Sequence, residues 1–175
     1  MRKSNEAENL AIEQAANLMC AAARTAPKTC GIDNIQTLIL SDTDIKKLIL
    51  KMREIAKRDN RPSCERDAKT IEGLKFCVVI ATKIVPVGLN CGFCGFKTCV
   101  ELKSKKGVCA YNAMDLGIAL SSAATIASRF HIDNRMMFSV GKAALELGMF
   151  DKDVGQAIGI PLSVSGKSIF FDRKL

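Results

Sequence analysis

Four cysteines in the middle of the chain carry the clearest chemistry in the sequence. They are Cys91, Cys94, Cys99 and Cys109, and the first three lie within nine positions. Clustered cysteines in a reducing compartment more often bind a metal or act in catalysis than form disulfides. The chain has one histidine, His131, so a metal site must consist mostly of thiolates. The segment of about 86–109 is therefore predicted to be a metal-binding loop.

The residues between these cysteines favour an iron–sulfur centre. Gly92 and Gly95 let the backbone turn tightly and leave its N–H groups free to point at sulfur, which stabilises an anionic cluster. Nearby lysines would offset part of the negative charge of a [4Fe–4S] cluster with four thiolates. Two alternatives remain open: a structural zinc ion, although its usual ribbon has two CxxC pairs and this chain has one, and packed thiols without a metal.

Composition indicates a globular protein. The chain has 175 residues, of which 48% are apolar and 25% are charged, and we expect one domain over residues 1–175. No apolar run reaches the 18 residues expected of a membrane span, and residues 1–14 lack the apolar core of a signal peptide. The expected protein is cytoplasmic and does not contact a membrane.

The net charge of +8 comes largely from two basic segments, residues 46–61 and 97–106. One interpretation is that they are solvated helix faces. The other is that they dock an acidic partner such as a small electron carrier. Nucleic acid is not the expected partner, because the chain has no Trp, one Tyr and no aromatic residues interleaved with the basic segments.

Apolar periodicity predicts more helix than strand. Helices are expected from Asn5 to Pro27, from Ser41 to Asn60, near 64–73, at about 111–130 and from Asp133 to Gly148. Strands are expected at 35–40, 75–82, 157–163 and 168–172. Because this order is not a simple β-α alternation, the predicted class is α+β. The helix at 111–130 is apolar all round, which predicts burial in the core or at the interface of a homodimer.

The cysteine segment NCGFCGFKTC is similar to the four-iron domain of corrinoid iron–sulfur and related anaerobic electron-transfer proteins. That domain reads C-G-x-C-G-aromatic-x-T-C. Here Cys109 follows sooner than the fourth ligand of that domain. The whole chain resembles the prokaryotic ferredoxin-domain-containing proteins of unknown function, through ARTAPK, the cysteine loop, MDLGIAL, DNRMMFSVG and GIPLSVSGKSIFFDR.

A second resemblance is to the nitroreductases. Residues 22–40, AARTAPKTCGIDNIQTLIL, resemble the signature in which Ala-Pro-Ser is followed by Asn-x-Gln-Pro-Trp and a strand. Here Lys28 replaces the usual Ser, Thr37 the Pro and Leu38 the Trp. The helix at 111–130 resembles that family's central interface helix. Residues 159–174 resemble its C-terminal segment, in which a basic residue approaches the flavin phosphate.

The nitroreductase resemblance implies a mixed sheet flanked by helices, an interlocked homodimer and FMN at its interface. The flavin candidates that it implies are Lys28, Asn34, Gln36 and Arg173. Together the two resemblances imply a redox protein, an iron–sulfur oxidoreductase or electron-transfer protein, with no catalytic side chain identified. The alternative is a non-enzymatic module that zinc stabilises and whose basic face binds a partner.

Overall fold

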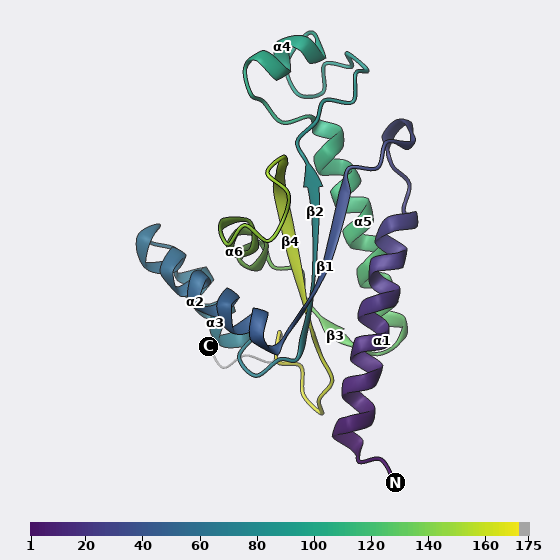
Figure 1. Cartoon of the computed structure of the whole chain (residues 1–175), viewed down its shortest axis with the longest axis vertical. Helices are drawn as coiled ribbons and strands as arrows, with labels where there is room; N and C mark the ends of the chain where they lie inside the picture. The colour runs from purple at the N-terminus through teal and green to yellow at the C-terminus, as the bar shows by residue number, and fades with distance from the viewer. Residues whose placement is uncertain (172–175) are drawn as a thin grey trace.

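The computed structural model describes residues 1–171, and a four-stranded sheet lies at its centre (Figure 1). The strands are β1 (Ile35–Ser41), β2 (Phe76–Lys83), β3 (Asp133–Asn134) and β4 (Val154–Ser163). Their order across the sheet is β1-β2-β4-β3, so β2 and β4 are central.

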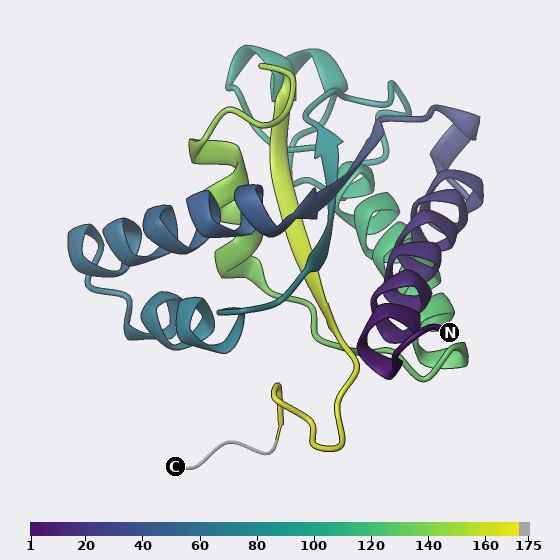
Figure 2. The ribbon, with the colours of Figure 1, turned by 60° about the horizontal axis from the view of Figure 1, so that its bottom comes forward.

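Helices cover both faces of this sheet (Figures 1 and 2). One face is covered by α1 (Ser4–Thr25) and α5 (Ala110–Arg129), and the other by α2 (Asp42–Arg58), α3 (Pro62–Thr70) and α6 (Phe138–Glu146). Two shorter helices lie in connections: the 3-10 turn η1 (Thr29–Gly31) and α4 (Cys99–Ser104).

Strand β2 divides the core into two layers. Its side chains alternate between the two faces, as the pleat of a strand requires. Cys77 and Val79 pack with residues of α2, α3 and α6, while Val78 and Ile80 pack with residues of α1 and α5. All four side chains are fully buried, and burial raises the pKa of the Cys77 thiol to about 12. Cys77 is therefore an inert core residue.

Small side chains allow α1 and α5 to pack closely against each other. Ala16 and Ala23 of α1 and Ala119 and Ala123 of α5 are fully buried in the same core layer. Helix α1 ends at Thr25 because Pro27 follows two residues later. Proline disfavours a helical conformation at the residue before it and offers no N–H of its own.

Two glycines set the distance between α6 and β4. An added Cβ at Gly141 would lie 1.8 Å from the carbonyl oxygen of Ala157, and one at Gly159 would lie 2.2 Å from Cγ1 of Val140. The backbone of Met137, just before α6, exchanges hydrogen bonds of 2.7 and 3.1 Å with Gly159. The start of α6 is thus fixed directly on the strand.

The predicted α+β class and the helices flanking the sheet are confirmed. The described strand pairs are all antiparallel, where the nitroreductase resemblance implied a mixed sheet. The connections explain this: β2 begins beside the end of β1, with Phe76 opposite Ser41, and β4 begins beside the end of β2, with Val154 opposite Lys83.

Two local predictions need correction. Asp133 pairs with Ser163 in β3 and does not cap a helix, so α6 begins only at Phe138. Residues 169–171 form a turn instead of a strand. Phe170 in this turn is fully buried against the α2, α3 and α6 layer. The predicted burial of α5 in the core or at a homodimer interface stays a prediction for its outer face, where Met114 and Ile118 are 41% and 42% exposed in the single chain.

Within residues 1–171, none of the helices combines the length and the hydropathy that crossing a bilayer requires.

We expect Gly141→Ala to destabilise the fold, because its Cβ would overlap the backbone of β4. Overpacking of this kind costs about 1–3 kcal/mol or more. Urea unfolding at neutral pH measures the effect. The matched control is Gly117→Ala in α5, whose Cβ meets no atom within 4 Å. That control should raise the free energy of unfolding by roughly 0.5–1 kcal/mol through helix propensity. Equal effects of the two variants would contradict the close contact of α6 with β4.

Candidate functional site

The cysteine loop leaves the end of β2 and returns to the chain at α5. It projects beyond the end of the sheet and carries α4 at its tip (Figure 1). Helix α4 begins after Thr98, whose Oγ1 accepts a hydrogen bond of 3.1 Å from the N–H of Glu101. The fold therefore places Cys99 in the first turn of α4 and Cys109 at the N-cap of α5.

The four predicted thiols line one small cavity. Asn90, Phe96 and Tyr111 complete its wall with other loop residues. Cys91 is exposed, Cys94 and Cys99 are half-buried, and Cys109 is 5% exposed. The structure thus brings together all four cysteines that the sequence predicted as ligands.

The backbone of the loop turns where the sequence placed glycines. Gly92 and Gly95 have φ values of 76° and 84°, which other residues rarely adopt, and the N–H of Gly95 donates to the carbonyl of Gly92 at 2.9 Å. This turn brings Cys94 back toward Cys91.

Asn90 is a candidate site residue that sequence reasoning missed. Its Oδ1 accepts a hydrogen bond of 2.8 Å from the N–H of Cys99, and its own N–H donates to Cys99 Sγ at 3.4 Å. Its φ of 50° is unusual except in residues such as Asn, which tolerate the left-handed region. An Asn directly before a CxxC motif was the available signal.

The cavity between the four thiols is small, about 10 Å³, and its thiols do not converge on one point. In the described part of the chain, no three His, Cys, Asp or Glu side chains are close enough to hold one metal ion. The thiols instead lie around the cavity wall. Zinc needs all its thiolates about 2.3 Å from one centre, whereas the four cysteines of a [4Fe–4S] cluster bind four different irons. Phe93 stacks on Tyr111 with ring centres 5.8 Å apart, so one aromatic pair covers part of this site.

Lys28, a predicted flavin-binding residue, lies between the end of α1 and the turn η1. Its Nζ donates to the carbonyls of Ala23 (3.0 Å), Arg24 and Ala26 (2.9 Å). Its side chain is only 6% exposed, and Asp33 lies 4.0 Å away. These bonds use all three ammonium donors, so a phosphate contact would require breaking at least one of them.

The other predicted flavin residues lie elsewhere. Gln36 donates from Nε2 to Asp151, and the backbone carbonyl of Asn34 accepts a bond of 3.0 Å from the N–H of Lys83. Both residues lie at the end of the sheet from which the cysteine loop emerges. Arg173 falls outside the described residues. A flavin-binding role for these four residues stays a prediction.

A larger cavity, which the sequence did not reveal, lies beside β4. It measures about 540 Å³ and is lined by α5, α6 and Gly155–Ile158 of β4. That volume is in the range of small-molecule sites. The Oε1 atom of Gln156 is buried and has no hydrogen-bond partner among the described residues. Lys142 and Glu146 line the same cavity and pair with each other at 3.0 Å. We name this the β4 cavity.

The fold is similar to that of solved flavoproteins. A nitroreductase with bound FMN from Desulfitobacterium hafniense has a TM-score of 0.62 and 13% identity, covering 89% of this chain and 79% of that one. A BluB-like flavoprotein from Clostridium difficile has a TM-score of 0.58 and 16% identity, covering 93% and 89%. A putative NADH dehydrogenase/NAD(P)H nitroreductase from Bacteroides thetaiotaomicron has a TM-score of 0.60 and 11% identity, covering 89% and 75%. These likenesses confirm the predicted nitroreductase-like fold.

Sequence comparison identifies the family. An uncharacterized protein of Archaeoglobus fulgidus is 39% identical over 175 residues, covering 95% of this chain and 94% of the relative. Residues 105–173 match the family model described as "uncharacterized protein containing a ferredoxin domain", and this segment includes Cys109 and α5. The chain therefore belongs to this family of uncharacterized proteins that contain a ferredoxin domain.

Proposed function

We propose that the chain is an iron–sulfur redox protein and that Cys91, Cys94, Cys99 and Cys109 hold a [4Fe–4S] cluster. The observation that carries this proposal is that the four thiols line one cavity. When bound, such a cluster accepts and donates single electrons. The ferredoxin-domain family and the nitroreductase-like fold both agree with redox chemistry.

The loop supplies what an anionic cluster needs. Cys109 at the N-cap of α5 lies at the positive end of a helix of 20 residues, which stabilises negative charge. The N–H of Asn90, directed at Cys99 Sγ, lowers the electron density on that sulfur. A zinc-stabilised, non-enzymatic module is the alternative. Zinc would require the thiols to move inward to a single centre, and a cluster would require the cavity of about 10 Å³ to open.

We further propose that FMN is a second cofactor and that its ring occupies the β4 cavity. The proposal rests on the flavoprotein fold and on Gln156, which lines the cavity and whose unpartnered Oε1 would turn toward a flavin imide N–H. Cys109 and Ala113 lie four residues apart on α5, about 6 Å along the helix axis at 1.5 Å per residue, so the cavity begins beside the cysteine site. FMN, when bound, would exchange electrons or a hydride with a small substrate, which makes the protein an oxidoreductase.

We also propose that the protein is a homodimer through the outer face of α5. Met114 and Ile118 of α5 and Phe138 of α6 are apolar and exposed, and Phe138 lines the β4 cavity. The outer edge of β4 pairs with β3 only at Leu162 and Ser163. Before these two residues it lacks a neighbouring strand among the described residues. A second copy would cover these apolar groups and close the cavity.

The cluster proposal predicts that Cys94→Ser loses most of its iron when the protein is purified without oxygen. One of four ligands is then missing, and an incomplete ligand set holds the cluster poorly. Iron per chain is measured by colorimetric assay. The matched control is Cys30→Ser, since Cys30 is exposed and lies outside the loop. Unchanged iron in Cys94→Ser would exclude this ligand assignment.

The flavin proposal predicts that Gln156→Ala binds FMN more weakly in a fluorescence titration. Losing one neutral hydrogen bond costs about 0.5–1.5 kcal/mol, which is roughly a two- to tenfold loss in affinity. Gln36→Ala is the comparison, because Gln36 belongs to the site that the sequence predicted. If Gln36→Ala alone weakened binding, the ring would lie at the end of β1 instead. Absence of binding up to millimolar FMN would remove the flavin altogether.

The dimer proposal predicts that Ile118→Glu yields a monomer in analytical ultracentrifugation. An unpaired charge buried in an interface costs about 3–5 kcal/mol, which weakens association at least roughly a hundredfold. Leu50→Glu is the control, because Leu50 is exposed on α2, on the other face of the sheet. Wild-type protein that sediments as a monomer, or Ile118→Glu that stays dimeric, would count against this interface.

A further inference from the structure

The two basic segments of the chain differ in how many of their charges are paired. Along α2, basic side chains are neutralised by carboxylates close by. Lys46 pairs with Asp42 at 3.5 Å and Lys51 with Glu54 at 2.6 Å, one turn or less away. Arg58 pairs with Glu146 at 2.9 Å. This helix face therefore presents little net positive charge to a partner.

The cysteine loop has the opposite character. Four lysines lie on or beside α4, and none of them forms an ion pair within residues 1–171; they are Lys97, Lys103, Lys105 and Lys106. Glu101 is the one acidic residue between positions 84 and 109. Its carboxylate accepts a hydrogen bond of 3.2 Å from the backbone N–H of Lys97. The loop thus carries unpaired positive charge at the projecting end of the molecule (Figure 1).

An apolar groove lies within this basic loop. Its walls are the segment that follows β2 and the first turn of α4: Ile84, Val85, Pro86, Cys99, Val100 and Lys103. Val100 is 79% exposed, although it is apolar. Cys99 thus lines both this groove and the four-cysteine cavity. A partner seated in the groove would lie next to a cluster ligand.

We propose that this groove and its four lysines form the docking face for an acidic electron-carrier protein of the ferredoxin or flavodoxin class. The combination is that of a specific transient interface, in which an apolar centre is surrounded by charges complementary to the partner. Unpaired lysines also steer an acidic protein toward the loop before contact. This inference rests on the proposed cluster, because the cluster gives the partner a reason to dock at Cys99.

The transfer at this face is a one-electron exchange. The reduced carrier loses one electron, and the oxidised cluster of this chain gains it. No bond forms or breaks, and no proton needs to move. Val100 and Pro86 line the groove, and their apolar side chains would exclude water between the partners. The distance between the two redox centres would then be short.

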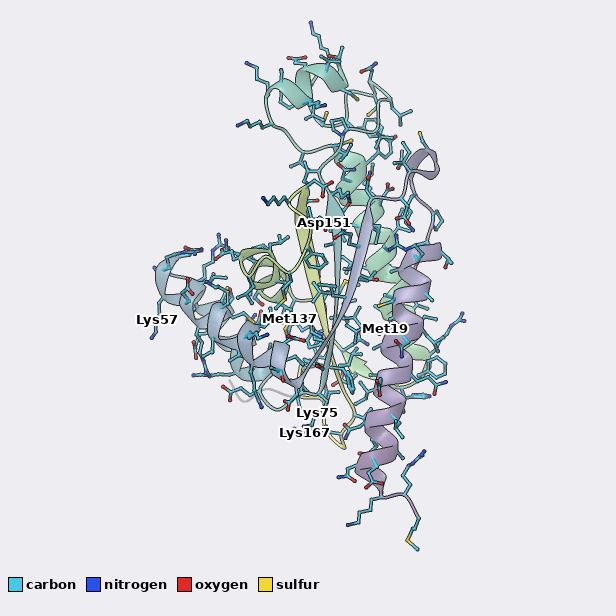
Figure 3. The ribbon with its side chains drawn as sticks, in the orientation of Figure 1. Met19, Lys57, Lys75, Met137, Asp151 and Lys167 are labelled. Carbon is cyan, nitrogen blue, oxygen red and sulfur yellow. The ribbon has the colours of Figure 1, made fainter. Side chains whose placement is uncertain are left out.

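The test measures binding of an acidic [2Fe–2S] ferredoxin and of a flavodoxin to the protein purified without oxygen, by titration calorimetry at low salt. The variant is Lys103→Glu/Lys106→Glu. The matched control is Lys57→Glu/Lys167→Glu, which makes the same change in net charge. Lys57 and Lys167 lie away from the cysteine loop and also lack ion pairs within the described residues (Figure 3).

We expect the loop variant to bind at least one of the carriers about tenfold or more weakly, and the control to differ from wild type by no more than about twofold. The difference should shrink as salt rises, because the Debye length falls to about 10 Å at 0.1 M. Val100→Ser should also weaken binding, whereas Leu50→Ser on α2, where Leu50 is 68% exposed against 79% for Val100, should not.

Equal binding by the loop variant and the control, or no binding of either carrier by wild type, would overturn the docking face. So would tight binding of single-stranded DNA or anionic vesicles that competes with the carriers. Iron content and bleaching by dithionite are recorded on the same samples. Protein that holds iron but binds no carrier refutes the docking face alone, while protein without iron refutes the cluster.

Discussion

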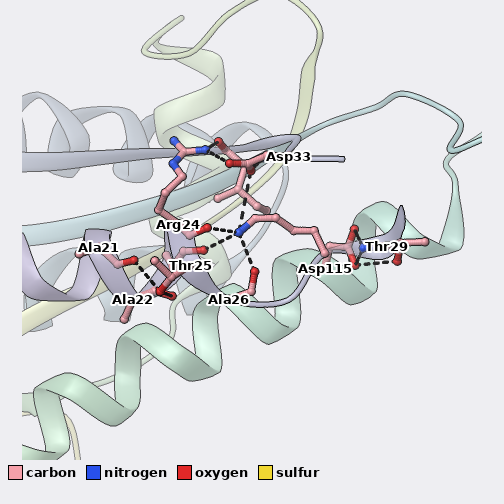
Figure 4. A network of polar contacts seen from close by, with 11 residues as sticks. Ala21, Ala22, Arg24, Thr25, Ala26, Thr29, Asp33 and Asp115 are labelled. Carbon is pink, nitrogen blue, oxygen red and sulfur yellow. Dashed lines mark hydrogen bonds and ion pairs between the residues drawn. The ribbon is translucent and has the colours of Figure 1, made fainter. Parts of the chain in front are cut away.

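Buried polar groups need hydrogen-bond partners, and two such groups in the first turns of α5 organise the working end of this molecule. Asn112 is fully buried; its Oδ1 accepts a bond of 3.1 Å from the N–H of Val85, while its Nδ2 has no partner among the described residues. Asp115 is 4% exposed and accepts bonds from the N–H and Oγ1 of Thr29, the latter at 2.9 Å (Figure 4). Leaving either group unpaired would cost about 1–3 kcal/mol or more. These bonds therefore fix the start of the cysteine loop and the turn after α1 to one helix.

Helix α5 consequently links the separate parts of the site. Its N-cap is Cys109, its next turns form one wall of the β4 cavity, and its inner face packs on α1 through alanines. The cysteine loop itself projects away from the sheet, so it can meet a large partner while the β4 cavity meets a small molecule or a second copy.

The sequence was sufficient for features that depend on local pattern. Cysteine spacing predicted that Cys91, Cys94, Cys99 and Cys109 would lie together, and all four line one cavity. For Cys91 and Cys94 a tight turn at Gly92 is enough to keep i and i+3 close. Apolar periodicity located the major helices and three of the strands. The helix predicted to end at Gly148 ends at Glu146. Gly148 follows with a φ of 66°, the left-handed conformation that glycine favours after a helix.

Features that depend on long-range packing could not be predicted. The sequence could not reveal that Lys28, a flavin-binding candidate, donates to carbonyls at and just after the end of α1. Gln156 could not be recognised as a cavity residue, because the cavity exists only where α5 and α6 flank β4. The basic segment on α2 could not be told apart from the one on the loop, because pairs such as Arg58 with Glu146 join residues far apart in sequence.

The most direct test of the central claim is the metal and sulfide content of wild-type protein purified without oxygen, together with its electron paramagnetic resonance after reduction by dithionite. The account predicts four irons and four acid-labile sulfides per chain and the signal of a reduced [4Fe–4S] centre. One zinc ion per chain, with neither iron nor sulfide, would contradict it.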